Sequence, residues 1–305
     1  MFSAPGSEAL GSRYTAVRLL GGDDMTEEGR AFAKHYRVGS FPTLLAMSPD
    51  GGVLAAGLPR DLAGLLAQMA EAATAEATFR ATVTKLGTST QPEDVRTLAG
   101  LYAARWQWAE ARKRYETLLA AEPTLDDTRA LLRTVEELGD VAARRALLAR
   151  LIRDYAQDPD RIHWRIALAE LGADEATIAG WRASLRELLA SVTTNGDRAA
   201  VRQRLASYAK RARDMEKAHE HWDWILTHAP KSRMAVSALH EKAIATVHAG
   251  YGRGDLAEVR RGRALLQRLV DEHGEDDHAR AARSLLVQVD MIIKQLEARP
   301  KGPGK

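Results

Sequence analysis

The chain of 305 residues contains no cysteine. This absence excludes disulfides, thiolate zinc sites, iron–sulfur clusters and thiol nucleophiles. Long apolar runs are missing as well, because charges interrupt every Leu- and Ala-rich stretch before it reaches the roughly 18 residues of a membrane span. We therefore expect no membrane insertion, no thiol redox activity in this chain and no cofactor.

An excess of charge of one sign is also missing, since 44 Lys and Arg stand against 41 Asp and Glu. Nucleic-acid surfaces are typically basic patches interleaved with aromatic residues. Neither residues 1–75 nor the rest of the chain has this pattern. The sequence also lacks a Gly-rich phosphate loop, a nucleophile elbow and a His-Glu-x-x-His motif. We predict no nucleic-acid partner and no catalytic residues.

The first 20 residues lack a basic segment followed by an apolar segment, the pattern of a signal peptide. As written, the sequence predicts a cytoplasmic protein. A periplasmic or exported protein would be expected if the true translation start lay upstream.

Residues 1–75 alternate between strand and helix patterns. The expected elements are a strand at residues 14–20, a helix capped by Asp24 and carrying Phe32 and Tyr36, strands at residues 43–47 and 53–56, and a helix capped by Asp61. Turn residues Ser48 to Gly52 join the last two strands into a hairpin.

This order, together with Val38-Gly39-Ser40-Phe41-Pro42-Thr43, resembles the C-terminal half of a thioredoxin fold. In that family the matching proline is cis and faces the redox motif, so the resemblance implies that Phe41, Pro42 and Thr43 face a substrate or partner. The alternative is an ordinary trans proline at the start of a strand.

The resemblance covers only residues 1–75 and begins in the middle of the fold. The first strand, first helix, second strand and Cys-x-x-Cys loop of the family would lie upstream of Met1. Two explanations stay open. The chain is an internally started fragment of a thiol-disulfide oxidoreductase, or it contains a true half-domain whose exposed sheet edge is covered by the helical region or a partner.

Residues 76–298 show helical periodicity with short interruptions, which indicates a solenoid of helical hairpins. Helices are predicted to start near Gln91, Trp106, Leu125, Asp140, Arg161, Asp174, Asp197, Asp214, Lys231, Asp255 and Glu275. The remaining residues, 299–305, are predicted to be a disordered tail.

Two hairpins resemble tetratricopeptide repeats, with small residues where helices cross and larger residues between them. The first set is Val95, Leu98, Ala99, Tyr102, Ala111, Tyr115 and Pro123. The second set, at the same offsets, is Leu205, Ala206, Ala209, Ala218, Trp222 and Pro230. The units between them are degenerate.

Three further groups of histidine and arginine residues are candidates for binding sites, and each has a simpler structural explanation. His273 and His278 flank an acidic loop and are weak metal candidates, but Asp276 or Asp277 in that loop is equally suited to cap the next helix. His219 and His221 point to different sides of a helix and are expected on its surface. Arg260, Arg261 and Arg263 could bind an acidic segment or form a solvated helix face.

Together these patterns predict an α+β part followed by an all-α part. A partial thioredoxin-like domain of order β-α-β-β-α occupies residues 1–75, and a tetratricopeptide-like α-solenoid occupies residues 76–298. The predicted function is non-catalytic protein interaction, with a protein or peptide ligand in the helical groove. The alternative is the oxidoreductase fragment described above.

Overall fold

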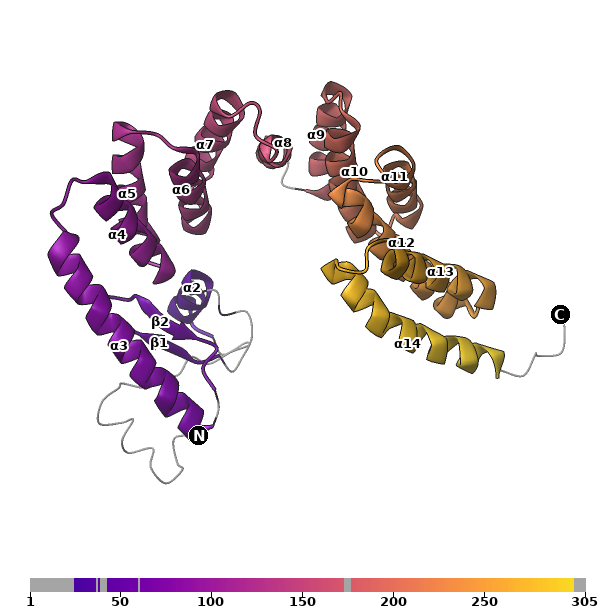
Figure 1. Cartoon of the computed structure of the whole chain (residues 1–305), viewed down its shortest axis with the longest axis horizontal. Helices are drawn as coiled ribbons and strands as arrows, with labels where there is room; N and C mark the ends of the chain where they lie inside the picture. The colour runs from indigo at the N-terminus through magenta and orange to yellow at the C-terminus, as the bar shows by residue number, and fades with distance from the viewer. Residues whose placement is uncertain (1–24, 37, 39–42, 60, 173–176, 299–305) are drawn as a thin grey trace. The chain divides into compact units, whose positions relative to one another are not determined.

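The computed structural model describes residues 25–36, 38, 43–59, 61–172 and 177–298 (Figure 1). The chain divides into two compact units, Met1–Leu147 and Leu148–Lys305. In chain order, the elements within the described residues are α2 (Glu27–His35), β1 (Leu45–Met47), β2 (Val53–Ala56), α3 (Leu62–Leu86), α4 (Pro92–Ala104), α5 (Trp108–Ala121), α6 (Leu125–Leu138), α7 (Val141–Asp154), α8 (Arg161–Leu171), α9 (Ile178–Ser191), α10 (Asn195–Arg211), α11 (Met215–His228), α12 (Arg233–Arg253), α13 (Leu256–Glu272) and α14 (Asp277–Glu297).

Helix α2 begins later than the sequence predicts. Its N-cap is Thr26, whose hydroxyl accepts the Gly29 N–H at 3.1 Å, so the predicted cap at Asp24 is wrong. The expected i, i+4 pair of Phe32 and Tyr36 is confirmed, with ring centroids 4.5 Å apart. The predicted strand at residues 14–20, the pair Phe41 and Pro42, and the tail 299–305 lie outside the described residues.

A short antiparallel hairpin, β1–β2, forms the sheet of the first unit, with Leu45 paired to Ala56. The strand predicted at residues 53–56 is confirmed, whereas the strand predicted at 43–47 begins only at Leu45. The turn uses Gly51 at φ 82°, a left-handed conformation that glycine adopts without strain. The predicted hairpin is therefore present.

The long helix α3 packs on this sheet (Figure 1). Asp61 caps its first turn as predicted, and Leu65 and Met69 pack on Ala46. The helix then continues without interruption through residue 75. The predicted domain boundary thus lies inside a helix that is common to the sheet region and the first helical hairpin.

The eleven helices that follow α3 confirm the predicted helix starts to within a few residues. The largest difference is at α9, which begins at Ile178 behind the N-cap Thr177 rather than near Asp174. None of the helices in the described ranges has both the length and the apolarity that a bilayer crossing requires.

The same tight turn joins four pairs of consecutive helices. One left-handed residue follows the first helix of each pair: Trp106 (φ 60°), Gly139 (φ 70°), Arg213 (φ 59°) and Gly254 (φ 68°). The N–H of the next residue then bonds to the carbonyl five positions back, as in Asp214 N to Ala209 O at 2.9 Å. This is the geometry of a Schellman motif, which reverses the chain and satisfies carbonyls at the helix end.

In three of these turns an aspartate follows the left-handed residue and caps the next helix. Asp140, Asp214 and Asp255 accept N–H groups of the first turns of α7, α11 and α13, at 2.9, 3.3 and 3.0 Å. A carboxylate at this position also suits the positive end of the helix dipole. The turn and its cap recur as a unit, which supports a repeated hairpin architecture.

Helices α12, α13 and α14 build the last core of the second unit. At the crossing of α12 and α13, a Cβ added to Gly262 would lie 2.5 Å from Cγ2 of Val247. Only glycine permits this approach of the two backbones. The fully or nearly buried side chains here are Leu239, Val247, Val259, Leu266, Leu269, Val289 and Leu296.

The recurring turn predicts opposite effects of glycine at two equivalent positions. Replacing Arg213→Gly should raise the free energy of unfolding by about 1 kcal/mol, because a left-handed Cβ is removed, and Gly139→Ala should lower it by about 1 kcal/mol. A Cβ at Gly139 meets no atom within 4 Å, so its cost is confined to the backbone. Urea unfolding followed by circular dichroism measures both, and equal signs for the two variants would contradict the prediction.

Candidate functional site

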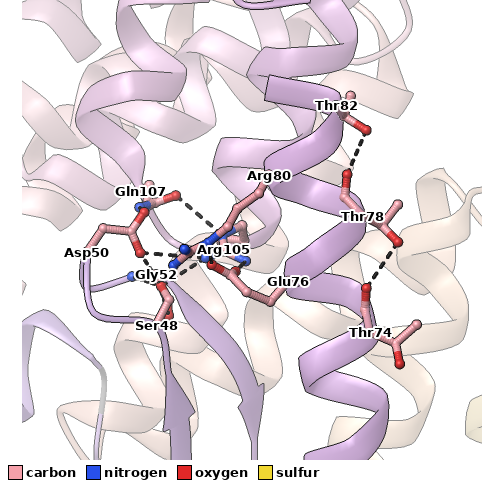
Figure 2. A network of polar contacts seen from close by, with 10 residues as sticks. All are labelled: Ser48, Asp50, Gly52, Thr74, Glu76, Thr78, Arg80, Thr82, Arg105 and Gln107. Carbon is pink, nitrogen blue, oxygen red and sulfur yellow. Dashed lines mark hydrogen bonds and ion pairs between the residues drawn. The ribbon is translucent and has the colours of Figure 1, made fainter. Parts of the chain in front are cut away.

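A buried arginine, Arg105, lies at the centre of a polar network that joins three elements of the first unit (Figure 2). It follows the end of α4, and only 7% of the residue is exposed. Its Nη2 donates to the Ser48 hydroxyl in the β1–β2 turn at 2.8 Å. Its Nη1 forms an ion pair with Oε2 of Glu76 on α3 at 2.5 Å. The guanidinium therefore connects the strand turn to α3.

The rest of Arg105 adds two further contacts. Its carbonyl accepts the N–H of Val53 at 2.9 Å, which extends the edge of β2 onto the end of α4. Its guanidinium carbon lies 3.9 Å from the ring centroid of Phe79, and that ring meets Tyr102 edge-on at 5.5 Å. Charge, backbone and cation–π contacts thus fix the residue together.

Asp50 forms the outer part of the network. The Ser48 hydroxyl donates to Asp50 and holds the pKa of this carboxyl below its usual value, with smaller contributions from Gln107 and Arg105. Nε2 of Gln107 donates to the other Asp50 oxygen at 3.0 Å. The turn is therefore anionic at neutral pH and faces the cation of Arg105.

Beside this network, α3 and α4 form an open groove of about 650 Å³. Its lining residues are Ala70, Glu71, Thr74, Ala75, Thr78, Phe79, Thr82 and Leu101. The three threonine hydroxyls donate to carbonyls four residues back at 2.9 to 3.1 Å. Figure 2 shows the bonds of Thr78 and Thr82 along α3. Their polar atoms are satisfied within the helix, so the groove wall presents mainly methyl groups and apolar side chains.

The residues of the first repeat pattern lie in the hairpin of α4 and α5. Val95, Leu98, Ala99 and Ala111 are buried, Tyr115 is 7% exposed and Tyr102 is half-buried. Pro123 is exposed and follows the end of α5 at Ala121.

The second pattern lies in α10 and α11. Leu205, Ala206, Ala209, Ala218 and Trp222 are all buried, and Pro230 follows the end of α11. Trp106 and Arg213, the two non-glycine residues with left-handed backbone among those that the structure describes, stand at the same place in the two hairpins.

The two histidines singled out for metal binding have different neighbours. His273 lies 4.0 Å from Glu272, whereas the His278 ring packs on His240 with centroids 4.8 Å apart. Asp276 caps α14 by accepting the N–H of His278 at 2.8 Å, which confirms the capping alternative. Within the described ranges, no group of three or more His, Cys, Asp or Glu side chains is arranged to hold a metal ion.

His219 and His221, both predicted on a helix surface, are both half-buried. Burial together with the nearby charge of Arg202 lowers the pKa of His221, on α11, to about 4. The ring is therefore neutral at pH 7, and its Nδ1 accepts from Nη1 of Arg202 at 3.3 Å. Burial also lowers the pKa of His219, whose ring meets Trp222 edge-on at 5.3 Å, and of His240.

The arginines that the sequence suggested for an acidic ligand already have partners. Arg260 pairs with Glu297 and Arg261 with Glu258, both at 2.6 Å, and Arg263 pairs with Asp290 at 2.5 Å. Of the thioredoxin-like triplet, Thr43 alone is described; it is half-buried and precedes β1. Arg105 was missed because its partners are distant in sequence and no local pattern marks it.

No protein-family model matches the chain, and no curated protein is similar to it. Among solved structures, the C-terminal part of a TPR repeat-containing protein from Cytophaga hutchinsonii is 14% identical, with a TM-score of 0.39, over 75% of this chain and 93% of that one. A filament named DHF58 is 15% identical, with a TM-score of 0.16, over 73% of this chain and 94% of the filament chain.

Removing the Arg105 guanidinium should destabilise the first unit strongly. Arg105→Ala removes the buried partner of the Glu76 carboxylate, the donor to Ser48 and the cation over Phe79, and it leaves Glu76 with only the exposed Arg80; we expect a loss of about 3 kcal/mol. Arg80→Ala removes an exposed partner of the same carboxylate and should cost no more than about 1 kcal/mol. Urea unfolding and hydrogen exchange of residues 45–56 report the difference. Adding Glu76→Gln to Arg105→Ala should recover part of the loss, and no recovery would contradict the role given to the ion pair.

The buried histidines predict loss of stability in acid. Their folded-state pKa values lie below the unfolded value, so the unfolded chain binds more protons and the second unit loses stability as pH falls from about 6.5 toward 4. His221→Gln should flatten this dependence of the unfolding midpoint, whereas His163→Gln, at an exposed position of α8, should leave it unchanged. A wild-type midpoint that stays constant over this range would contradict the assignment.

Proposed function

We propose that this chain is a non-catalytic scaffold that binds a segment of another protein. In this proposal a thioredoxin-like half over residues 1–75 is followed by tetratricopeptide-like hairpins. The order helix, antiparallel hairpin, helix of α2, β1, β2 and α3 supports the first part. The tetratricopeptide-like part is supported by the four turns of the same geometry and by the matching buried positions of the α4–α5 and α10–α11 hairpins.

The observation that carries the proposal is the groove along α3 and α4. It follows α3 from Ala70 to Thr82, which corresponds to about 18 Å of helix, or three turns. In this stretch the charges of Glu76 and Arg80 are paired with each other at 2.5 Å, and Glu76 also pairs with Arg105. The lining consists of alanine and threonine side chains with Phe79 and Leu101, and Glu71 is the charged residue among them.

This surface suits the apolar face of a short amphipathic helix. Small side chains allow two helix axes to approach to about 8–10 Å, and each further buried apolar side chain adds about 1.5–3 kcal/mol. Helical repeats normally end in a polar cap that keeps them soluble. Here no described helix covers the groove, so a helix of a partner protein would take the position that the next repeat helix would otherwise occupy.

Selection from a phage-displayed peptide library on the full chain tests the proposal. We expect enriched peptides with apolar residues at helical spacing, and Thr78→Arg should weaken their binding at least about tenfold by placing a charge in the groove. Ala73→Arg is the matched control, because Ala73 is exposed on α3 but does not line the groove. Isothermal titration with synthetic peptides measures the affinities.

Two outcomes would contradict the proposed occupant. Selected peptides that bind the Thr78→Arg variant as well as the wild type would show that the groove is not their site. A wild-type dimer that dissociates on the same substitution, measured by light scattering, would assign the groove to a second copy of the chain.

A further inference from the structure

Three arginines of the second unit line one hollow of about 320 Å³. Arg186 comes from α9, and Arg198 and Arg202 come from α10. The remaining walls are Leu189, Ala190 and the indole of Trp224 on α11. The hollow thus combines a concentrated positive charge with an apolar wall, and it shares no residue with the α3–α4 groove.

These three guanidinium groups lack anionic partners. In the described part of the chain, no carboxylate forms an ion pair with Arg186, Arg198 or Arg202, although most other arginines have one. Their neighbours are neutralised: Arg182 pairs with Asp214 at 3.0 Å, and Arg204 pairs with Glu170. The arginine pocket, defined here as Arg186, Arg198, Arg202 and Trp224, therefore gathers three arginines without a carboxylate partner into one hollow.

Arg202 is held in place by neutral groups only. Its Nη1 donates to neutral His221, and its guanidinium carbon lies 4.4 Å from the ring centroid of Trp224. Its Nε is buried and has no hydrogen-bond partner. Burial and the adjacent charge of Arg198 lower the pKa of Arg202, which shows that the site disfavours its own cation.

The arrangement costs stability in the free protein. Arg198 and Arg202 stand four positions apart on one helix, where like charges repel each other and destabilise the helix. Arg198 is also fixed, because its Nε donates to the carbonyl of Val192 at 3.1 Å. An anion that entered the hollow would relieve the repulsion and supply the missing acceptor of Arg202.

We propose that the arginine pocket binds an acidic segment of a partner protein, with an Asp or Glu carboxylate on the guanidinium groups and an adjacent apolar side chain on Trp224. The volume lies at the small end of ligand sites and fits one or two side chains. A nucleic acid is a poorer match, because it needs a continuous basic track for successive phosphates. Along α9 and α10, the cations Arg182, Arg204 and Lys210 are paired with Asp214, Glu170 and Glu241, so they do not extend the pocket into such a track.

Isothermal titration of the full chain with two peptides tests this assignment. The probe is an acetylated, amidated peptide of repeating Glu-Leu-Glu-Gly, and its control replaces every Glu by Gln. We expect only the Glu peptide to bind, with an affinity that falls as salt rises. Arg202→Gln should weaken binding at least about tenfold, the usual effect of losing one charged hydrogen bond.

Matched variants separate the pocket from general electrostatics and from misfolding. Arg186→Gln changes an exposed residue that has no described partner, so it should leave the fold intact and still weaken binding severalfold. Arg260→Gln removes the same charge at a paired site and should leave the affinity unchanged. Thr78→Arg should also have no effect, which distinguishes this site from the α3–α4 groove.

Three results would overturn the proposal. The first is absence of binding at millimolar Glu peptide. The second is an equal loss of affinity in Arg186→Gln and Arg260→Gln. The third is displacement of the peptide by inorganic phosphate or a thymidine oligonucleotide at a concentration lower than that of the peptide. The last result would identify a phosphate site in place of a carboxylate site.

Discussion

The ion pair between Arg105 and Glu76 is the contact on which the first unit depends. Few local contacts fix the short β1–β2 hairpin, because two strands alone are marginal in water. Arg105 joins its turn to α3, and the Val53 hydrogen bond joins its second strand to the end of α4. With α3 fixed in this way against α4, the groove between them has a defined shape before any ligand arrives.

Charge is distributed differently at the two candidate sites, and the difference indicates different ligands. The groove is lined mainly by small and apolar side chains, with Glu71 as its charged lining residue, and its threonine hydroxyls are satisfied by the helix backbone, so shape and apolar area are the main source of affinity. In the arginine pocket the positive charges remain uncompensated, so an anion gains energy there that it cannot gain at the paired Arg260 or Arg263.

The sequence predicted what depends on neighbours along the chain. Helix starts follow from caps such as Asp61, Asp214 and Asp255, and the small residues of α10 and α11 follow from helical spacing. Arg105 could not be predicted, because Ser48 and Glu76 are brought to it only by the fold. For Arg198 and Arg202 the sequence does give a partial indication of an unpaired cation, since neither has an acidic residue three or four positions away. Arg260 shares that signal and is nevertheless paired across helices, so spacing alone does not identify a free cation.

The absence of cysteine acquires a more specific meaning beside these sites. The chain has no thiol, and in the part of it that the structure describes no three or more histidine, aspartate or glutamate side chains are grouped so that they could hold a metal ion. The ring of His221 is neutral because burial and Arg202 lower its pKa, and the same hydrogen bond that orients Arg202 occupies Nδ1. A histidine that often serves as a base in enzymes acts here as a fixed acceptor that positions a cation toward an open hollow.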